Sequence, residues 1–291
     1  HYPKMSCVLN SFKHSKWGSH YLWDLELDVP IFLKTHFPSE VLEAYNSLTL
    51  PRFKSDLARY CLLLIHGGVY AEPDIILNVD LDNAIQMDIG FMAVVVNISR
   101  PMNGRQSSPC LWSAFLVSAP GHPFLAKLIE MIVNNIRNRF TSVDYDAMFC
   151  PFPPAFDLTW NHPNHLTTGS CILGAAVNAV LGRPLSSTFD AGDLLHGEHN
   201  SNSSIPGRTF ILQPEFPEMT SLRFMNVQEN VIIGTSVRNE VEKWPEGMLY
   251  TSASTGNTIK NSLYGRNGIY ADTFCAHEDI ILSVSTSASN T

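Results

Sequence analysis

The chain has 291 residues, of which 27 are acidic and 19 basic, so its formal net charge is −8 at pH 7. Hydrophobic residues make up 45% of the chain and charged residues 16%, a balance that fills a core and excludes intrinsic disorder. The acidic excess disfavours a nucleic-acid or anionic-membrane partner, since both need a cationic surface, although it leaves room for a local basic pocket that binds phosphate. We expect a single domain over residues 1–291, with residues 285–291 as a flexible tail.

Six cysteines are scattered along the chain without a C-x-x-C pair, so a structural zinc site is not expected. Their even number permits disulfides but indicates no pairing, and Cys61, inside an apolar helical run, is expected in the core. The longest apolar run, Ile89–Val96, is too short to cross a bilayer. Because the chain opens at His1 rather than at a methionine, the sequence is compatible with a membrane anchor that has been removed.

Strands and helices are expected to alternate along the chain. The clearest helix is Arg52–His66, where apolar residues recur at helical spacing and Gly67-Gly68 follow as a C-terminal stop. We expect strands at Lys4–Leu9, Val29–Leu33, Val69–Leu77, Phe91–Asn97, Thr209–Leu212 and Val231–Ile233, and helices at Pro38–Leu48, Arg52–His66, Pro123–Arg139 and Cys171–Leu181. This alternation predicts an α/β fold with a mostly parallel central sheet flanked by helices, which binds ligands at the carboxyl ends of its strands.

One segment gathers polar side chains that suit chemistry. Asp56 and Arg59 are three residues apart on the predicted helix and share a face, while Tyr70, Glu72 and Asp74 alternate along the strand that follows. Two carboxylates at a strand end suit a hard divalent cation with a substrate diphosphate, and an arginine beside them suits a phosphate. The competing interpretation is a set of solvated acids with a helix-surface ion pair. The combination of all five residues beside Gly-Gly favours the binding site.

Several other chemistries lose their support because their motifs are absent. The sequence contains no GxxxxGK[ST] loop, GxGxxG fingerprint, GxSxG elbow or HExxH helix, which disfavours P-loop enzymes, Rossmann dehydrogenases, α/β-hydrolases and zincins. His162 and His165 lack paired cysteines or a metal-binding helix, so we interpret them as part of a loop on the acceptor side. Asp80 and Asp82 follow the polar segment and are interpreted as a solvated turn.

The strings KSDLARY at residues 54–60 and HGGVYAEPD at residues 66–74 resemble the sugar-binding DXD region of glycosyltransferases. The resemblance is to the family that contains the initiating α-1,6-mannosyltransferases and the α-1,4-galactosyltransferases. Weaker similarities follow at Gly121–Phe124, Thr168–Ser170, Ile211–Pro217 and Ala276-His277. The resemblance implies a GT-A type fold, that is, a nucleotide-sugar-binding α/β sandwich.

The resemblance also implies roles for the donor-binding residues. Asp56 and Arg59 match the family's contacts to the donor sugar and diphosphate, and Tyr70 matches the tyrosine near the nucleotide. Glu72 stands where the family has its first Asp, which contacts the ribose and the bound metal. The catalytic set implied in this way is Asp56, Arg59 and Asp74.

The metal ligands implied by the resemblance are Asp74, Glu72 and His277, with Asp74 coordinating directly. The oxygen ligands suit Mn²⁺ or Mg²⁺, and a histidine ligand leans away from Mg²⁺. After His277 the chain reads Glu278-Asp279 in place of the family's Ser-Trp. The retained carboxylate at Glu72 leads us to expect that metal binding persists.

The resulting hypothesis is an enzyme, a metal-dependent retaining glycosyltransferase that moves a hexose from a nucleotide sugar. The expected donor is GDP-mannose or a UDP-hexose, and a glycan, lipid or protein hydroxyl is the expected acceptor. The alternative is a degenerate GT-A domain that binds nucleotide sugar or glycan without turnover. The resemblance implies the Golgi lumen for a eukaryotic protein, with a type II anchor absent from this chain; otherwise the protein would be secreted or act in the host cytosol.

Overall fold

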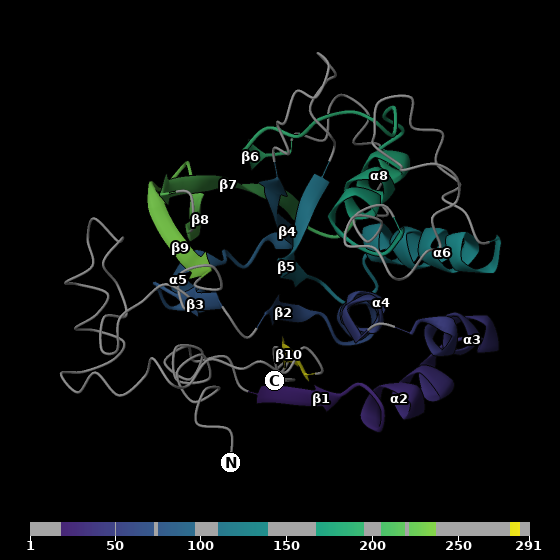
Figure 1. Cartoon of the computed structure of the whole chain (residues 1–291). Helices are drawn as coiled ribbons and strands as arrows, with labels where there is room; N and C mark the ends of the chain where they lie inside the picture. The colour runs from purple at the N-terminus through teal and green to yellow at the C-terminus, as the bar shows by residue number, and fades with distance from the viewer. Residues whose placement is uncertain are drawn as a thin grey trace.

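The computed structural model describes residues 19–49, 51–72, 75–96, 110–138, 167–194, 205–218, 221–236 and 280–285. Figure 1 shows a central column of strands with most helices on one side and a curled group of strands on the other. The helices are α2 (Asp28–His36), α3 (Ser39–Ser47), α4 (Pro51–His66), α5 (Leu81–Ala84), α6 (Pro123–Asn138) and α8 (Ser170–Val180). The strands are β1 (Ser19–Asp24), β2 (Gly68–Ala71), β3 (Ile75–Leu77), β4 (Ile89–Val96), β5 (Cys110–Ser118), β6 (Gly192–Asp193), β7 (Arg208–Glu218), β8 (Ser221–Asn226), β9 (Val231–Ser236) and β10 (Ile280–Ser285).

Four of the predicted helices are confirmed as α3, α4, α6 and α8. The end of α4 follows the predicted pattern, because Gly67 and Gly68 have φ angles of +65° and +97°. The Gly67 N–H donates to the carbonyl of Leu63 at 2.9 Å, which completes the last turn. The predicted strands near residues 91–97, 209–212 and 231–233 are confirmed as parts of β4, β7 and β9. The predicted strand Lys4–Leu9 lies outside the described residues. Of the predicted tail 285–291, Ser285 is the last residue of β10 and pairs with Ser19, and the remainder lies outside the described residues.

The predicted strand Val29–Leu33 is wrong, because this segment lies inside helix α2. A short apolar run is ambiguous between strand and helix. The buried residues of α2 are Val29, Phe32 and Leu33, whose i, i+3, i+4 spacing places them on one face of a helix. Burial of that face favours a helix over a strand for this segment.

The predicted strand Val69–Leu77 is divided into two strands that lie in different parts of the sheet. β2 pairs with β5 and β10, whereas β3 pairs with β9. The Ile75 N–H donates to the Glu72 carbonyl at 3.0 Å, so the chain turns between the two strands. The sequence between the two strands contains a proline, a residue without an N–H to donate to a ladder. The predicted i, i+2 series therefore does not continue along a single strand beyond Glu72.

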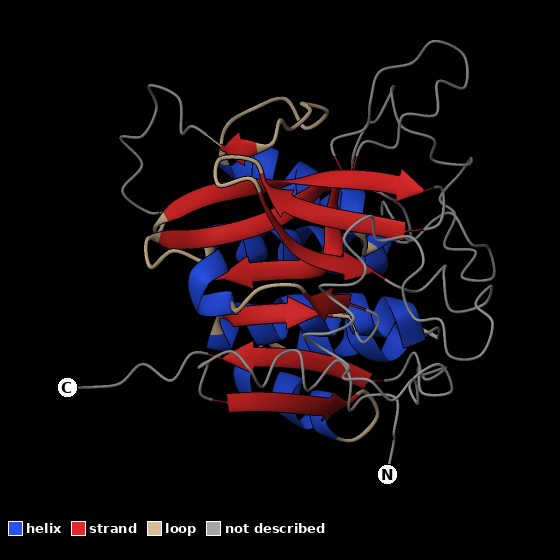
Figure 2. Cartoon of the chain, turned by 90° about the vertical axis from the view of Figure 1, so that its left-hand side faces the viewer, coloured by secondary structure: helices blue, strands red, loops and turns tan. Residues whose placement is uncertain are grey.

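The ten described strands form one sheet in the order β1-β10-β2-β5-β4-β7-β8-β9-β3, with β6 paired to β7. Because β3 follows β2 in the chain but ends this order, the sheet curls back over its own centre, as Figure 2 shows. The α/β class is confirmed, and the mixed sheet with helices packed on it is consistent with a GT-A type fold. The predicted mostly parallel sheet is wrong: β4 with β7 is the one parallel pair among the described strands. The element order that suggested parallel pairing had omitted β5, which lies antiparallel to both β2 and β4.

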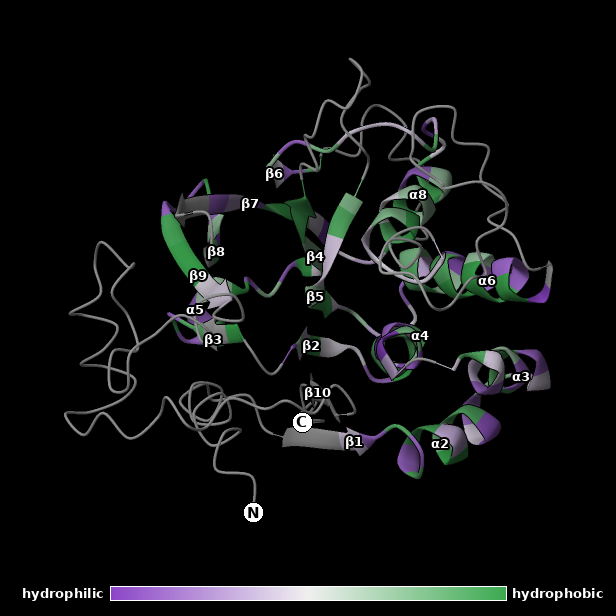
Figure 3. Ribbon diagram, in the orientation of Figure 1, coloured by the Kyte–Doolittle hydropathy of each residue, from purple (hydrophilic) through white to green (hydrophobic). Residues whose placement is uncertain are grey.

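The central strands are buried on both faces, so their side chains fill two cores. Phe91 and Ala93 of β4 point into the core beneath the helices, and Met92 and Val94 point into the core under the curled strands. Figure 3 shows the hydrophobic colouring concentrated on these strands and on the helices beside them. Burial on both faces explains why β4 reads as a continuous apolar run rather than an alternating one.

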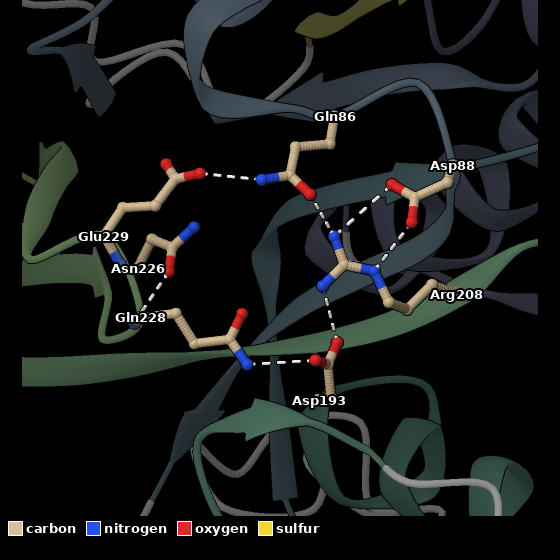
Figure 4. Close-up of polar contacts among 7 residues, drawn as sticks. All are labelled: Gln86, Asp88, Asp193, Arg208, Asn226, Gln228 and Glu229. Carbon is tan, nitrogen blue, oxygen red and sulfur yellow. Dashed lines mark hydrogen bonds and ion pairs between the residues drawn. The ribbon is translucent and has the colours of Figure 1, made fainter.

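A polar network outside the cores fixes the start of β7. The Arg208 guanidinium contacts Asp88 at 3.0 Å and Asp193 at 2.7 Å and also bonds to Gln86 (Figure 4). Gln228 donates to Asp193 at 2.9 Å, so the β8–β9 turn joins the same group. Through these contacts the segment before β4, strand β6 and the β8–β9 turn are all linked to the start of β7.

A disulfide joins Cys110, the first residue of β5, to Cys171 in the first turn of α8. The sequence had permitted a disulfide without indicating this pairing. Cys61 is free and fully buried, as expected of a core residue. Within the described residues, none of the helices has the length and apolar character needed to cross a membrane.

Candidate active site

Helix α4 places Asp56 and Arg59 between the helix layer and the sheet. They are 7% and 3% exposed, because α4 is buried around most of its circumference. The Arg59 Nη2 atom lies 3.1 Å from Asp56 Oδ1. The predicted pair on one helix face is thus present, but it is a buried ion pair and not a solvated one.

The Arg59 guanidinium is fully occupied by the protein. Nε donates to the carbonyl of Ser55, and Nη2 donates to the Ser55 hydroxyl at 3.0 Å in addition to its contact with Asp56. Nη1 donates to Glu72 Oε1 at 3.0 Å and to the Ser113 carbonyl at 2.9 Å. A guanidinium has five N–H donors, and this arrangement gives each of them a partner. Arg59 therefore holds two carboxylates at a fixed separation.

The Ser113 carbonyl reaches Arg59 because β5 is irregular at this point. Ala93 of β4 pairs with Leu116, whereas the next residue, Val94, pairs with Trp112, so residues 113–115 form a bulge. Bulges redirect backbone groups and are common beside functional sites. This contact could not be predicted from sequence, since a backbone carbonyl has no residue-type signal.

Tyr70 lies on the helix-side face of β2 with its ring against Arg59. The Arg59 Cζ atom is 4.5 Å from the ring centroid, a cation–π distance, and Tyr70 is 1% exposed. Burial raises the pKa of Tyr70 well above its usual range, so its hydroxyl stays protonated. The buried Tyr70 ring thus packs against the guanidinium and restricts its position.

Glu72 follows β2 and opens the site towards solvent. Its N–H donates to the Ala114 carbonyl at 2.8 Å, which fixes its backbone against β5. Its side chain is 25% exposed and is bound by Arg59 through Oε1. Of the site's carboxylates in the described residues, Glu72 is thus the more accessible to a ligand.

Thr168 is a site residue whose role the sequence did not indicate, although its Thr-Gly-Ser string was part of the resemblance. Its hydroxyl donates to Asp56 Oδ2 at 2.8 Å, across 112 residues of sequence. Burial raises the pKa of Asp56 to about 6, while Arg59 and the Thr168 hydrogen bond oppose the rise and Glu72 adds to it. Among the described residues, Asp56 Oδ1 contacts Arg59 and Oδ2 contacts Thr168, which leaves each oxygen a lone pair that can accept from a ligand hydroxyl.

The predicted metal ligands are described only in part. Asp74 and His277 lie outside the described residues, so the structure does not place them. In the described part of the chain, no group of three His, Cys, Asp or Glu side chains is arranged to hold a metal ion. Glu72 fits a divalent cation by its chemistry, because it is a partly exposed carboxylate that is oriented by the Arg59 guanidinium bound to its Oε1.

Residues 4–90 match the model of the family described as "Glycosyltransferase sugar-binding region containing DXD motif". The chain is 37% identical over 62 residues to the uncharacterized glycosyltransferase L373 of Acanthamoeba polyphaga mimivirus, covering 21% of this chain and 25% of that protein. It is 28% identical over 106 residues to the initiation-specific alpha-1,6-mannosyltransferase of Schizosaccharomyces pombe, covering 33% and 26%. The chain thus spans about a quarter of the length of the curated relatives that it matches.

Among solved structures, the PaToxG glycosyltransferase matches 55% of this chain and 54% of its own, with 13% identity and a TM-score of 0.33. A TM-score this low does not by itself establish a shared fold. The family match covers the helix and strand that carry Asp56, Arg59, Tyr70 and Glu72. The predicted resemblance to the DXD-motif glycosyltransferases is therefore confirmed, over the residues 4–90 that match the family model.

Proposed function

We propose that this protein is a metal-dependent retaining glycosyltransferase that moves a hexose from a nucleotide sugar to a hydroxyl acceptor. The observation that carries the proposal is the buried Asp56–Arg59–Glu72 array within the matched sugar-binding region. An isolated surface ion pair would not need a guanidinium with every donor occupied. A mannosyl donor is the first candidate, because one relative is named as an alpha-1,6-mannosyltransferase.

In this proposal Asp56 binds the donor sugar. A carboxylate is an acceptor only, and each of its oxygens still has a lone pair after the contacts with Arg59 and Thr168. Sugar hydroxyls are donors that fit this acceptor. Arg59 acts by positioning the carboxylates, since reaching a diphosphate would require it to release a partner that it now binds.

Glu72 and Asp74, with His277, would hold a divalent cation at the open side of the array. Bound there, the cation would stabilise the negative charge that develops on a departing nucleoside diphosphate. Arg59 contributes by keeping Glu72 oriented, with Oε1 on the guanidinium. Retention and the choice of acceptor hydroxyl belong to the proposal through the family resemblance.

The test is a panel of GDP- and UDP-sugars incubated with the protein, with and without Mn²⁺, while nucleoside diphosphate release is measured. We expect release from one donor, dependent on metal and lost in Asp74→Ala. The matched control is Asp80→Ala, which removes an exposed carboxylate that makes no side-chain capping bond to α5. The anomeric configuration of the product, read by NMR, tests retention.

Two other outcomes would contradict the proposal. Metal-dependent binding of a donor without release of nucleotide would identify a binding domain and refute turnover. Cleavage of the diphosphate, with nucleoside monophosphate as product, would identify a pyrophosphatase.

A further inference from the structure

Two segments far from α4 in sequence contact the Asp56–Arg59 pair. The carbonyl of Ser113, in β5, accepts from Arg59, and the hydroxyl of Thr168, just before α8, donates to Asp56 Oδ2. Thr168 is fully buried and Ser113 is 7% exposed, so neither contact competes with bulk water. The position of the Asp56 carboxylate thus depends on β5 and on the start of α8 as well as on its own helix.

These two segments are covalently joined. Cys110 stands three residues before Ser113, and Cys171 stands three residues after Thr168. The disulfide between them links the start of β5 to the start of α8 and is buried, with Cys110 0% and Cys171 2% exposed. The disulfide therefore closes a covalent loop that contains both Ser113 and Thr168.

The start of α8 has no side-chain cap of its own to fix it. Gly169 occupies the N-cap position and makes no side-chain capping bond. An N-cap serine, threonine, asparagine or aspartate would have satisfied the first N–H groups of the helix and fixed the entering chain. The disulfide at Cys171 ties this end of α8 to the start of β5.

We propose that Thr168 is a positioning residue for the donor-binding carboxylate of Asp56, and that the Cys110–Cys171 disulfide keeps Thr168 within reach of it. The assignment of Asp56 to the donor rests on the proposed function, whereas the positioning of Asp56 rests on the contacts described here. Thr168 does not touch the donor. It fixes the rotamer of a buried carboxylate, so that the remaining lone pairs point in one direction.

The first experiment compares Thr168→Val with Thr168→Ser. Valine keeps the shape of the side chain and removes the hydroxyl, whereas serine keeps the hydroxyl and removes a methyl group. Because a hydrogen bond to a charged group is a strong one, we expect Thr168→Val to raise the donor KM by about tenfold or more, with a smaller change in kcat. Thr168→Ser should stay within about twofold of the wild type. A purely structural Thr168 would give equal KM values in both variants, and that result would overturn the proposal.

A second measurement is independent of any donor. In a double-mutant cycle, Asp56→Asn and Thr168→Val are combined, and the urea midpoints of unfolding are compared. We expect the double variant to deviate from the sum of the single changes, because both substitutions alter one contact. Additive midpoints would overturn the positioning of Asp56 by Thr168. If the cycle shows coupling but the wild-type protein neither binds nor cleaves any donor, the proposed function is refuted and the contact between Thr168 and Asp56 stands.

The disulfide is tested by the double variant Cys110→Ala/Cys171→Ala. We expect its donor KM to rise in the same direction as that of Thr168→Val, and the triple variant to add little, since both changes act on one contact. The control is Cys61→Ala, which removes a fully buried free thiol on α4 and leaves the disulfide intact. If the cystine variant melts at a lower temperature but keeps the wild-type donor KM, the disulfide only stabilises the fold and this part of the proposal is wrong.

Discussion

The buried carboxyl of Asp56 makes the stability of the protein depend on pH in an unusual direction. Burial raises the pKa of Asp56 from 3.8 to about 6, in spite of the Arg59 guanidinium beside it. Between pH 4 and pH 6 the folded state therefore binds more protons at this site than the unfolded chain does. By linkage, the free energy of unfolding falls as the pH rises through this window. The difference in pKa corresponds to about 3 kcal/mol.

Asp56→Asn removes the titrating group while keeping its shape. We expect the free energy of unfolding of the wild type, minus that of the variant, to fall by about 2 kcal/mol between pH 4 and pH 7, which is most of the full difference. Urea denaturation at intervals of half a pH unit measures this difference, and Asp80→Asn, at an exposed carboxylate, provides the control. A difference that is constant with pH, or that increases, would refute the view that burial outweighs Arg59 at this site.

Three further substitutions test other contacts. Arg59→Lys keeps the charge, but a lysine ammonium cannot bind two carboxylates and the Ser113 carbonyl as the planar guanidinium does. Urea denaturation should show that the free energy of unfolding falls by about 3 kcal/mol, and a fall below about 0.5 kcal/mol would contradict the geometry. Gly67→Ala places a Cβ 2.6 Å from Pro120 Cδ at a φ of +65°, so we expect a loss of about 1–3 kcal/mol, seen as a melting temperature lower by several degrees. Arg208→Met removes partly exposed ion pairs, and its cost of about 1 kcal/mol should shrink in high salt; an unchanged cost would show that packing, not charge, dominates there.

The part of the site that could be predicted from sequence is the part encoded within a few residues. Asp56 and Arg59 are neighbours on a helix whose period is fixed, and Tyr70 and Glu72 follow a Gly-Gly stop that brings the next strand alongside. Local geometry is therefore enough to bring these side chains together. The hydrogen bond from Thr168 to Asp56 could not be predicted, because it depends on packing between residues that lie 112 positions apart in sequence.

The errors in the predicted fold have physical origins of a similar kind. A five-residue apolar run such as Val29–Leu33 has too few residues to distinguish a period of 2 from one of 3.6. Strand direction depends on which strands become neighbours, and that is decided by how both faces of the sheet are covered. The division between β2 and β3 has a local signal in the sequence, a proline without an N–H, but the position of β3 beside β9 is set by tertiary structure.

The pairing of β1 with β10 sets the order in which the molecule can be completed. Ser19 lies opposite Ser285, and β10 in turn pairs with β2. During synthesis, β1 and one edge of β2 must therefore wait for almost all of the intervening chain before they find their partner. Until then the growing protein presents unpaired strand edges, the kind of surface on which chains associate with one another. Addition of β10, the last described strand of the chain, pairs these edges of β1 and β2.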